Sequence, residues 1–221
     1  MTAATRRPRL LDLYCCQGGA SAGYARAGFD VVGIDIEPQP RYPFTFVQAD
    51  AVQYVLEHGA QFDFIHASPP CQFDSDCQRI MGRDHPDLIG PTRAALEEVG
   101  VPYVMENVRG ALPKLREPVE LCGTMFGLRT YRHRYFEGGN GFTVPARHHP
   151  RHLAPQVKMG RAPRDGEFIQ AVGNFSGVGI VRADWGVPWM NRDGIRESIP
   201  PAYAQWIGEA FLESSGLAVA A

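Results

Sequence analysis

The sequence lacks several features that mark specialised classes of protein. No apolar run among its 221 residues approaches the roughly 20 residues that a membrane-spanning helix requires. Segment 1–16 carries arginines followed by only a short apolar stretch, which favours a first strand over an export signal. We therefore expect a cytoplasmic protein that does not enter a membrane.

Cysteine is scarce, and its pattern excludes a disulfide scaffold. The five cysteines, an odd number, suit a reducing compartment. Because no Cys or His pair has short zinc-finger spacing, we expect no metal site. The histidines of segment 147–152 leave metal binding open, but a basic loop that contacts phosphates is the simpler interpretation.

The phosphate-binding patterns GxxxxGK[ST] and GxGxxG are both absent. The formal net charge is -2, which excludes a wholly basic surface but leaves a local basic patch possible. Hydrophobic residues make up 44% and charged residues 21% of the chain, as in ordinary globular proteins. The length fits one domain with a small additional lobe.

Apolar segments alternate with helical ones through the first half of the chain. This alternation predicts an α/β fold with a mostly parallel, Rossmann-like sheet covered by helices on both faces. Ligands of such sheets bind at the carboxyl ends of the strands. We expect strands at 9–14, 30–36, 44–48, 62–67 and 102–106, and helices at 20–27, 51–58, 88–99 and 201–213.

Periodicity ends after residue 138. We expect a main domain formed by 1–138 and 191–221, with a small irregular lobe at 139–190. Residues 138–164 contain no Asp or Glu, so this lobe could contact nucleic-acid phosphates; a solvated loop is the alternative. Its basic residues are Arg147, Arg151, Lys158, Arg161 and Arg164.

A glycine pair, Gly18 and Gly19, separates the first strand from the first helix. Glycine lets a ligand approach the backbone, and the helix N-terminus offers free N–H groups. Asp35 follows 17 residues after Gly18, which suits an acidic residue that holds ribose hydroxyls. Asp50 could accept a hydrogen bond from an adenine amino group or cap the next helix. Plain turns remain the alternative.

Cys71 follows two prolines at the end of the fourth predicted strand. The prolines fix the backbone, and a nucleophilic thiolate needs a fixed position. A buried structural cysteine is the alternative. That alternative is our expectation for the other four, Cys15, Cys16, Cys77 and Cys122.

Four further segments follow the glycine loop: Pro69–Gln72 (PPCQ), Glu106–Val108 (ENV), Arg132–Arg134 (RHR) and Ile199–Tyr203 (IPPAY). Their order resembles the motif series of the DNA (cytosine-5) methyltransferases, from about residue 9 to 213. The resemblance implies a class I methyltransferase fold, S-adenosylmethionine as cofactor and double-stranded DNA as substrate. It also implies a compact, phage-type or orphan member in a bacterial or phage-infected cell. We expect a monomer.

The resemblance implies a role for each motif residue. Cys71 would attack C6 of a flipped-out cytosine, and Glu106 would contact N3 and help to protonate it. Arg132, and less directly Arg134, would stabilise the attacked ring, while Gln72 would contact the DNA. Residues implied to bind the cofactor are Tyr14, Gly18, Gly19, Asp35, Ile36, Asp50, Ala51, Pro70 and Ser198.

The chain departs from the family pattern at several positions. Cys16 stands where the first loop usually has glycine, and Thr130 stands where Gln usually precedes the arginines. Glu197-Ser198 replaces the usual Gly-Asn-Ser or Gly-Asn-Ala. The segment that normally reads the target sequence is short, so a short target, relaxed specificity or a partner that supplies recognition are all open.

Three other functions remain open from the sequence. An N4-cytosine or N6-adenine amino-methyltransferase would explain Ser68-Pro69-Pro70, but such enzymes have an aromatic residue where this chain has Cys71. RNA or a free cytosine nucleotide could replace DNA as the substrate of the same chemistry. A non-catalytic DNA-binding relative could also keep the fold.

Overall fold

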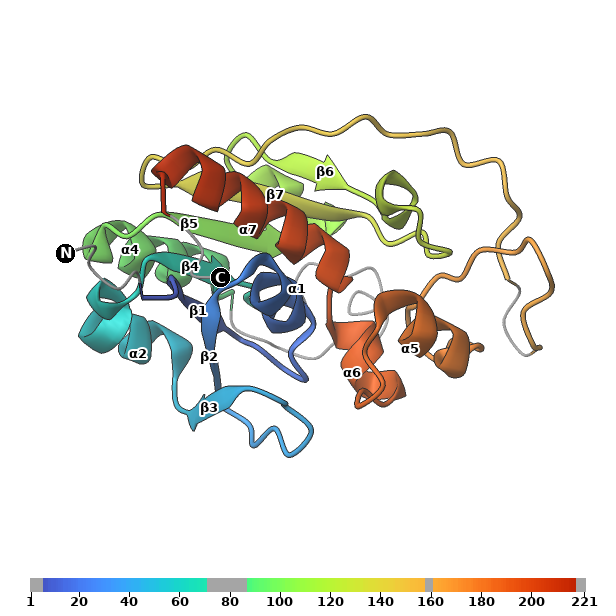
Figure 1. Ribbon diagram of the computed structural model, residues 1–221, viewed down its shortest axis with the longest axis horizontal. Helices are drawn as coiled ribbons and strands as arrows, with labels where there is room; N and C mark the ends of the chain where they lie inside the picture. The colour runs from blue at the N-terminus through green and yellow to red at the C-terminus, as the bar shows by residue number, and fades with distance from the viewer. Residues whose placement is uncertain (1–5, 71–86, 158–160, 218–221) are drawn as a thin grey trace.

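The computed structural model describes residues 6–70, 87–157 and 161–217 (Figure 1). Among these residues, a seven-stranded sheet has the order β3-β2-β1-β4-β5-β7-β6. The first five strands run parallel, whereas β7 is antiparallel to both β5 and β6. The strands are β1 Arg9–Leu13, β2 Asp30–Asp35, β3 Thr45–Gln48, β4 Phe64–Ala67, β5 Tyr103–Asn107, β6 Val119–Leu121 and β7 Arg134–Gly139.

Helices cover both faces of this sheet, as the sequence predicts. One layer contains α1 and α7, which pack against each other, and the opposite layer contains α2 and α4 (Figure 1). The α-helices are α1 Gly19–Ala27, α2 Ala51–His58, α4 Ile89–Val99, α5 Val178–Trp185, α6 Arg192–Glu197 and α7 Pro201–Ser215. Short 3-10 helices are η1 Gly59–Gln61, η3 Arg109–Lys114 and η4 Gly123–Phe126. Every strand and helix predicted from the sequence is present, with ends within two residues.

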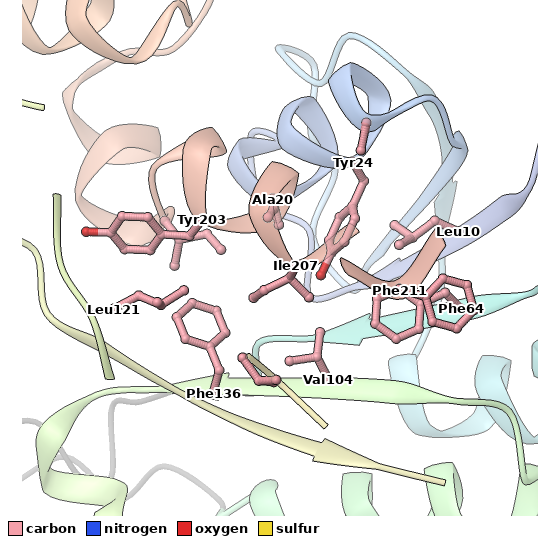
Figure 2. Close-up of a cluster of buried hydrophobic side chains, with 14 of the residues drawn as sticks. Leu10, Ala20, Tyr24, Phe64, Val104, Leu121, Phe136, Tyr203, Ile207 and Phe211 are labelled. Atoms are coloured by element: carbon pink, nitrogen blue, oxygen red, sulfur yellow. The ribbon is translucent and has the colours of Figure 1, made fainter. Parts of the chain in front are cut away.

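The central strands are apolar on both faces because both faces are buried. Leu10, Phe64 and Val104 point into the cluster beneath α1 and α7 (Figure 2). The next residue of each strand points to the opposite face and joins the cluster with α2 and α4. This two-sided burial is the main source of stability in the parallel part of the sheet.

Close packing brings the C-terminal segment onto the start of α1. A Cβ on Gly23 would lie 2.1 Å from the carbonyl oxygen of Pro201, so only glycine permits this approach of α1 and α7. A Cβ on Gly19 would lie 2.6 Å from the Cβ of Ser198. The C-terminal segment therefore lies beside the glycine loop, as the sequence predicts.

The region after β7 contains more regular structure than we predict from the sequence. Helix α5 and most of a third buried cluster, which includes Ile169, Trp185 and Met190, lie where an irregular lobe is expected. The eight residues of α5 lie between Gly177 and Gly186, in a stretch whose glycines favour turns over a helix. The described parts of this region before α5, residues 140–157 and 161–177, contain no helix or strand, apart from residues in two isolated bridges. No helix in the described ranges is long and apolar enough to cross a membrane.

Candidate active site

Three buried polar residues end the apolar rows on the α1–α7 face of the sheet. Asp12 in β1, His66 in β4 and Glu106 in β5 each come two residues after an apolar residue of that face. Because side chains alternate along a strand, all three point to the same face. Asp12 and His66 are register partners. The parallel strands therefore place a row of polar groups at their carboxyl ends, where ligands bind in this kind of sheet.

A chain of hydrogen bonds runs from the core to Glu106. The Tyr24 hydroxyl lies 3.0 Å from Nδ1 of His66, and Nε2 of His66 lies 2.8 Å from the Ser68 hydroxyl. Ser68 in turn hydrogen-bonds Glu106. Burial lowers the pKa of His66 to about 3, so the ring is neutral and carries one N–H. In one consistent arrangement, the Tyr24 hydroxyl donates to Nδ1 of His66 and the Nε2–H of His66 donates to Ser68. The Ser68 hydroxyl then donates to Glu106, so that each donor has an acceptor.

Glu106 is a buried carboxyl group beside an arginine. Oε1 of Glu106 lies 2.8 Å from Nε of Arg134, yet this oxygen receives no well-aligned hydrogen bond from the described residues. Burial raises the pKa of Glu106, while Arg134, Ser68 and Arg132 oppose that rise. The carboxyl group is thus able to carry a proton nearer neutral pH than an exposed glutamate could.

The strand ends fix the chain that leads to the predicted nucleophile. The side-chain amide of Asn107 donates a 3.0 Å hydrogen bond to the carbonyl oxygen of Pro69. Pro69 is buried and Pro70 is exposed. The predicted nucleophile Cys71 and its neighbour Gln72 lie outside the described residues. The end of β5 therefore anchors the chain immediately before Cys71 and also carries Glu106.

Arg132 makes different contacts from Arg134. Its guanidinium group is buried and donates to the backbone carbonyls of Ala171, Arg196 and Ser198. The described contacts of Arg132 thus join the start of β7 to the helical region and the C-terminal segment. We interpret Arg132 as a positioning residue, whereas Arg134 lies directly against Glu106.

The glycine loop has an unusual backbone. Tyr14 and Cys16 have φ angles of 62° and 45°, and Gly18 has 83°. Such values are uncommon for residues other than glycine and occur at functional sites. Asp35 stabilises the loop, since its carboxylate accepts from the N–H of Cys16 at 2.9 Å and from that of Glu37 at 3.0 Å. With a φ of 45°, Cys16 has a left-handed backbone conformation that glycine adopts more readily than other residues.

Side chains around this loop suit a nucleoside ligand. Ile36 directly follows β2 and is 64% exposed, so it presents an apolar surface next to Asp35. Asp50 is exposed and also caps α2 through the N–H of Gln53 at 2.9 Å. Within the described chain, the buried Ser198 hydroxyl has no hydrogen-bond partner. An unsatisfied hydroxyl, an exposed carboxylate and an apolar platform are the groups that a ribose and a base require.

The remaining predicted cofactor residues lie on the same edge of the sheet. The Tyr14 hydroxyl lies 2.7 Å from that of Thr92 in α4, which holds the ring against the start of the loop. Ala51 is the buried first residue of α2. The structure thus brings together, near the carboxyl ends of β1 to β4, Tyr14, Gly18, Gly19, Asp35, Ile36, Asp50, Ala51, Pro70 and Ser198.

A buried network beneath the loop has no counterpart in our sequence predictions. The Ser21 hydroxyl donates to Asp12 and lies 2.7 Å from the Tyr42 hydroxyl. Burial raises the pKa of Asp12 to about 7. Gly33 makes room for this network, since a Cβ there would lie 2.2 Å from the Tyr42 hydroxyl oxygen. A glycine inside a predicted strand was the available signal.

The basic residues after β7 are not all available to phosphates. Arg147 lies over the rings of Phe126 and Trp206, with its guanidinium carbon 4.8 and 4.7 Å from their centroids. Arg161 pairs with Glu167, whose Oε2 also accepts from the backbone N–H of Arg164 at 2.7 Å.

These contacts make the unpaired positive charge of this region smaller than the residue count indicates. Arg151 and Arg164 are exposed, whereas Lys158 lies outside the described residues.

Comparison with solved structures identifies the same fold in methyltransferases. A protein encoded within an E. coli prophage and assigned as a DNA modification methyltransferase is 16% identical, with a TM-score of 0.62, covering 95% of this chain and 99% of that chain. Dnmt2 of S. pombe is 14% identical, with a TM-score of 0.60 and the same coverage. EhMeth of Entamoeba histolytica is 9% identical, with a TM-score of 0.58 and again the same coverage.

No family model and no curated protein matches the chain. The three similar structures are methyltransferases by name, and each is covered almost completely. The chain therefore has the Rossmann-like fold of class I methyltransferases, the fold that its ordered motifs predict.

Proposed function

We propose that this protein methylates C5 of cytosine in double-stranded DNA, with S-adenosylmethionine as the methyl donor. The observation that carries the proposal is the buried Glu106 beside Arg134, at the end of the strand that anchors Pro69. The ordered motifs and the methyltransferase fold support it. The name of the prophage protein, a DNA modification methyltransferase, favours DNA as the substrate.

The chemistry requires covalent activation, because C5 of cytosine is a poor nucleophile. In the proposed reaction the Cys71 thiolate forms a bond to C6, and negative charge develops on the ring. Glu106 donates a proton to N3, which its raised pKa favours, and Arg134 stabilises the charged ring. After C5 receives the methyl group, a base removes the C5 proton, the C6–S bond breaks to release the Cys71 thiolate, and the N3 proton returns to Glu106.

The glycine-loop residues would hold the cofactor. Asp35 would orient the ribose, Ile36 would contact the adenine ring, and Asp50 would accept from its amino group. The buried Ser198 hydroxyl would find its missing partner there. S-adenosylmethionine supplies the methyl group when it is bound. Asp35 also holds the loop itself, so binding and loop conformation depend on one carboxylate.

The target base must leave the duplex to reach Glu106, because the reacting atoms of a stacked base are inaccessible. Arg132 would act indirectly by fixing the start of β7, and therefore Arg134, against the helical region. Exposed Arg151 and Arg164, together with Lys158 and Gln72, are the proposed contacts to DNA.

The test is expression in a bacterium that lacks its own DNA methylation, followed by conversion sequencing that detects protected cytosines. A Cys71→Ala variant expressed to the same level is the control. We expect protected cytosines at one set of flanking bases, and we expect the variant to lose them. Protection that persists in the variant would support N4 methylation instead. If neither strain shows protection, transfer of labelled methyl groups to RNA and to a cytosine nucleotide tests the remaining substrates.

A further inference from the structure

Four side chains that can bind a metal meet at the edge of the sheet remote from the glycine loop. Cys122 directly follows β6 and His133 directly precedes β7. His149 and His152 come from the irregular segment 140–177, which runs past β6 toward α5 in Figure 1. The four potential ligand atoms all lie within 4.8 Å of one another.

The distances inside this group approach those of a tetrahedral zinc site. Nε2 of His133 lies 3.3 Å from Nε2 of His149, and Sγ of Cys122 lies 3.3 Å from Nε2 of His152. Zinc bonds of roughly 2.0–2.1 Å to nitrogen and 2.3 Å to sulfur place two tetrahedral nitrogens about 3.3 Å apart, and a nitrogen and a sulfur about 3.6 Å apart. Small side-chain rotations would bring all four ligand atoms to these distances around one ion.

The surroundings orient the ligand atoms toward the centre. Nδ1 of His149 lies 2.8 Å from the carbonyl oxygen of Pro150. A carbonyl oxygen only accepts, so Nδ1 donates this bond, and Nε2 is the atom that faces His133, with Oε1 of Glu120 3.6 Å away. The bond to the Pro150 carbonyl is the outer-shell contact that zinc-binding histidines commonly make. The ring of His152 stacks on Tyr131, with centroids 3.9 Å apart, and is held in place by that contact.

We propose that Cys122, His133, His149 and His152 bind one zinc ion in a closed, structural site. One thiolate and three imidazoles form a ligand set that zinc favours, and with all four bound no position is left for catalysis. The metal would fasten segment 149–152 to the ends of β6 and β7. It would also fix His133, which stands between Arg132 and Arg134. The proposal replaces the expectation of no metal and does not depend on the methyl-transfer chemistry.

Sequence spacing hid this set, because the first three ligands are far apart along the chain. Ten residues separate Cys122 from His133, and fifteen separate His133 from His149. Only the antiparallel pairing of β6 with β7 and the return of the irregular segment bring them together. Without metal, the same rings would form a stacked and hydrogen-bonded cluster, which is the outcome that the experiment must distinguish.

The experiment measures zinc in protein purified without a polyhistidine tag from cells grown with added zinc. Mass spectrometry should find about one zinc per chain. The variants Cys122→Ser and His149→Gln should each lose at least about tenfold in zinc affinity, measured by competition with a chromogenic chelator. His148→Gln is the matched control, because His148 is the exposed neighbour that lies outside the group, and it should keep the metal.

Cobalt substitution provides a readout specific for the cysteine. Cobalt(II) added to the metal-free protein should give the intense visible bands of a tetrahedral site and a thiolate charge-transfer band. The charge-transfer band should disappear in Cys122→Ser and remain in His148→Gln. The proposal is overturned if correctly folded protein, shown by circular dichroism, holds no stoichiometric zinc after reconstitution, or if His148→Gln loses as much metal as His149→Gln.

Discussion

The parallel half of the sheet and the irregular segment 140–177 are held in place by different kinds of interaction. In β1 to β5, alternating apolar residues bury both faces against helices, and no single contact dominates. In segment 140–177, separate polar and aromatic contacts fix the chain, among them Arg147 over Trp206 and Arg161 with Glu167. The apolar pattern that buries the strands repeats along the sequence, whereas each contact in segment 140–177 depends on a particular pair of residues.

Arg132 and Arg134, which are two residues apart, also differ in the contacts that hold them. Arg134 lies beside the polar row at the strand ends, where the proposed chemistry takes place. Arg132 donates to three backbone carbonyls, which ties Ala171 and the C-terminal segment to the start of β7. Equal charge and nearly equal position in the sequence therefore do not give equal contacts.

The largest expected effect follows from replacing the buried carboxyl group of the parallel half. Glu106→Gln removes the proton donor while keeping the shape, so we expect methyl transfer to fall by roughly 10²- to 10⁴-fold. The melting temperature should not fall, because the variant removes a carboxyl group whose ionised form is disfavoured by burial. Single-turnover kinetics and thermal unfolding measure the two effects. Near-normal activity in Glu106→Gln would contradict the proposed role.

The second prediction separates the two arginines. Arg132→Met leaves three carbonyls without their donors, and we expect it to lower the free energy of unfolding by about 3 kcal/mol or more. Arg134→Lys should instead change the melting temperature little and lower methyl transfer, because lysine cannot reproduce the guanidinium geometry. Denaturant unfolding and activity assays on both variants test this. If both lose stability equally, the distinction between positioning and site residue fails.

The third prediction concerns the buried network beneath the glycine loop. Burial raises the pKa of Asp12 to about 7, above its usual value of 3.8, so the folded protein retains a proton that the unfolded chain releases. The stabilising contribution of that proton is fully present below about pH 4 and is lost as pH rises through 7.

Asp12→Asn removes this pH dependence. Between pH 5 and pH 8, we expect the variant to gain roughly 2 kcal/mol relative to the wild type, with about 1.4 kcal/mol per pH unit as the upper limit. Denaturant unfolding of both proteins at the two pH values gives the difference in their free energies of unfolding. The contributions of other titrating groups, such as His66, are the same in both proteins and cancel in that difference. A constant difference would show that Asp12 has an ordinary pKa in the folded protein.

The smallest expected effect concerns Cys16, the departure from the family pattern in the glycine loop. Its φ of 45° is one that glycine adopts freely, but glycine also increases the entropy of the unfolded chain. Because these effects oppose each other, we expect Cys16→Gly to change the free energy of unfolding by less than about 1 kcal/mol. Cys16→Val, which has a branched side chain at the same φ, is the contrasting variant and should destabilise clearly more.

Much of the fold was predictable because it depends on local patterns. The period-two apolar strands and the helices between them predicted the parallel sheet, and the motif order predicted which strand ends carry Asp35 and Glu106. β6, β7 and α5 were not predicted because they follow β5, outside the strand–helix alternation on which the prediction rested, and β7 pairs antiparallel with both β5 and β6. The His66–Ser68 relay was not predicted because a single histidine in a strand carries no periodic signal.

The sequence by itself determined the parallel α/β core, the polar ends of its strands and the glycine turn after β1, since each follows from residues close together in the chain. The tertiary structure alone decided what Arg132 holds, that Glu167 pairs with Arg161, and that one cysteine meets three histidines. Those contacts join residues 6 to 66 positions apart through side chains whose direction is set by packing. Local propensity fixes where a strand begins and ends, but only the folded chain fixes which polar groups meet.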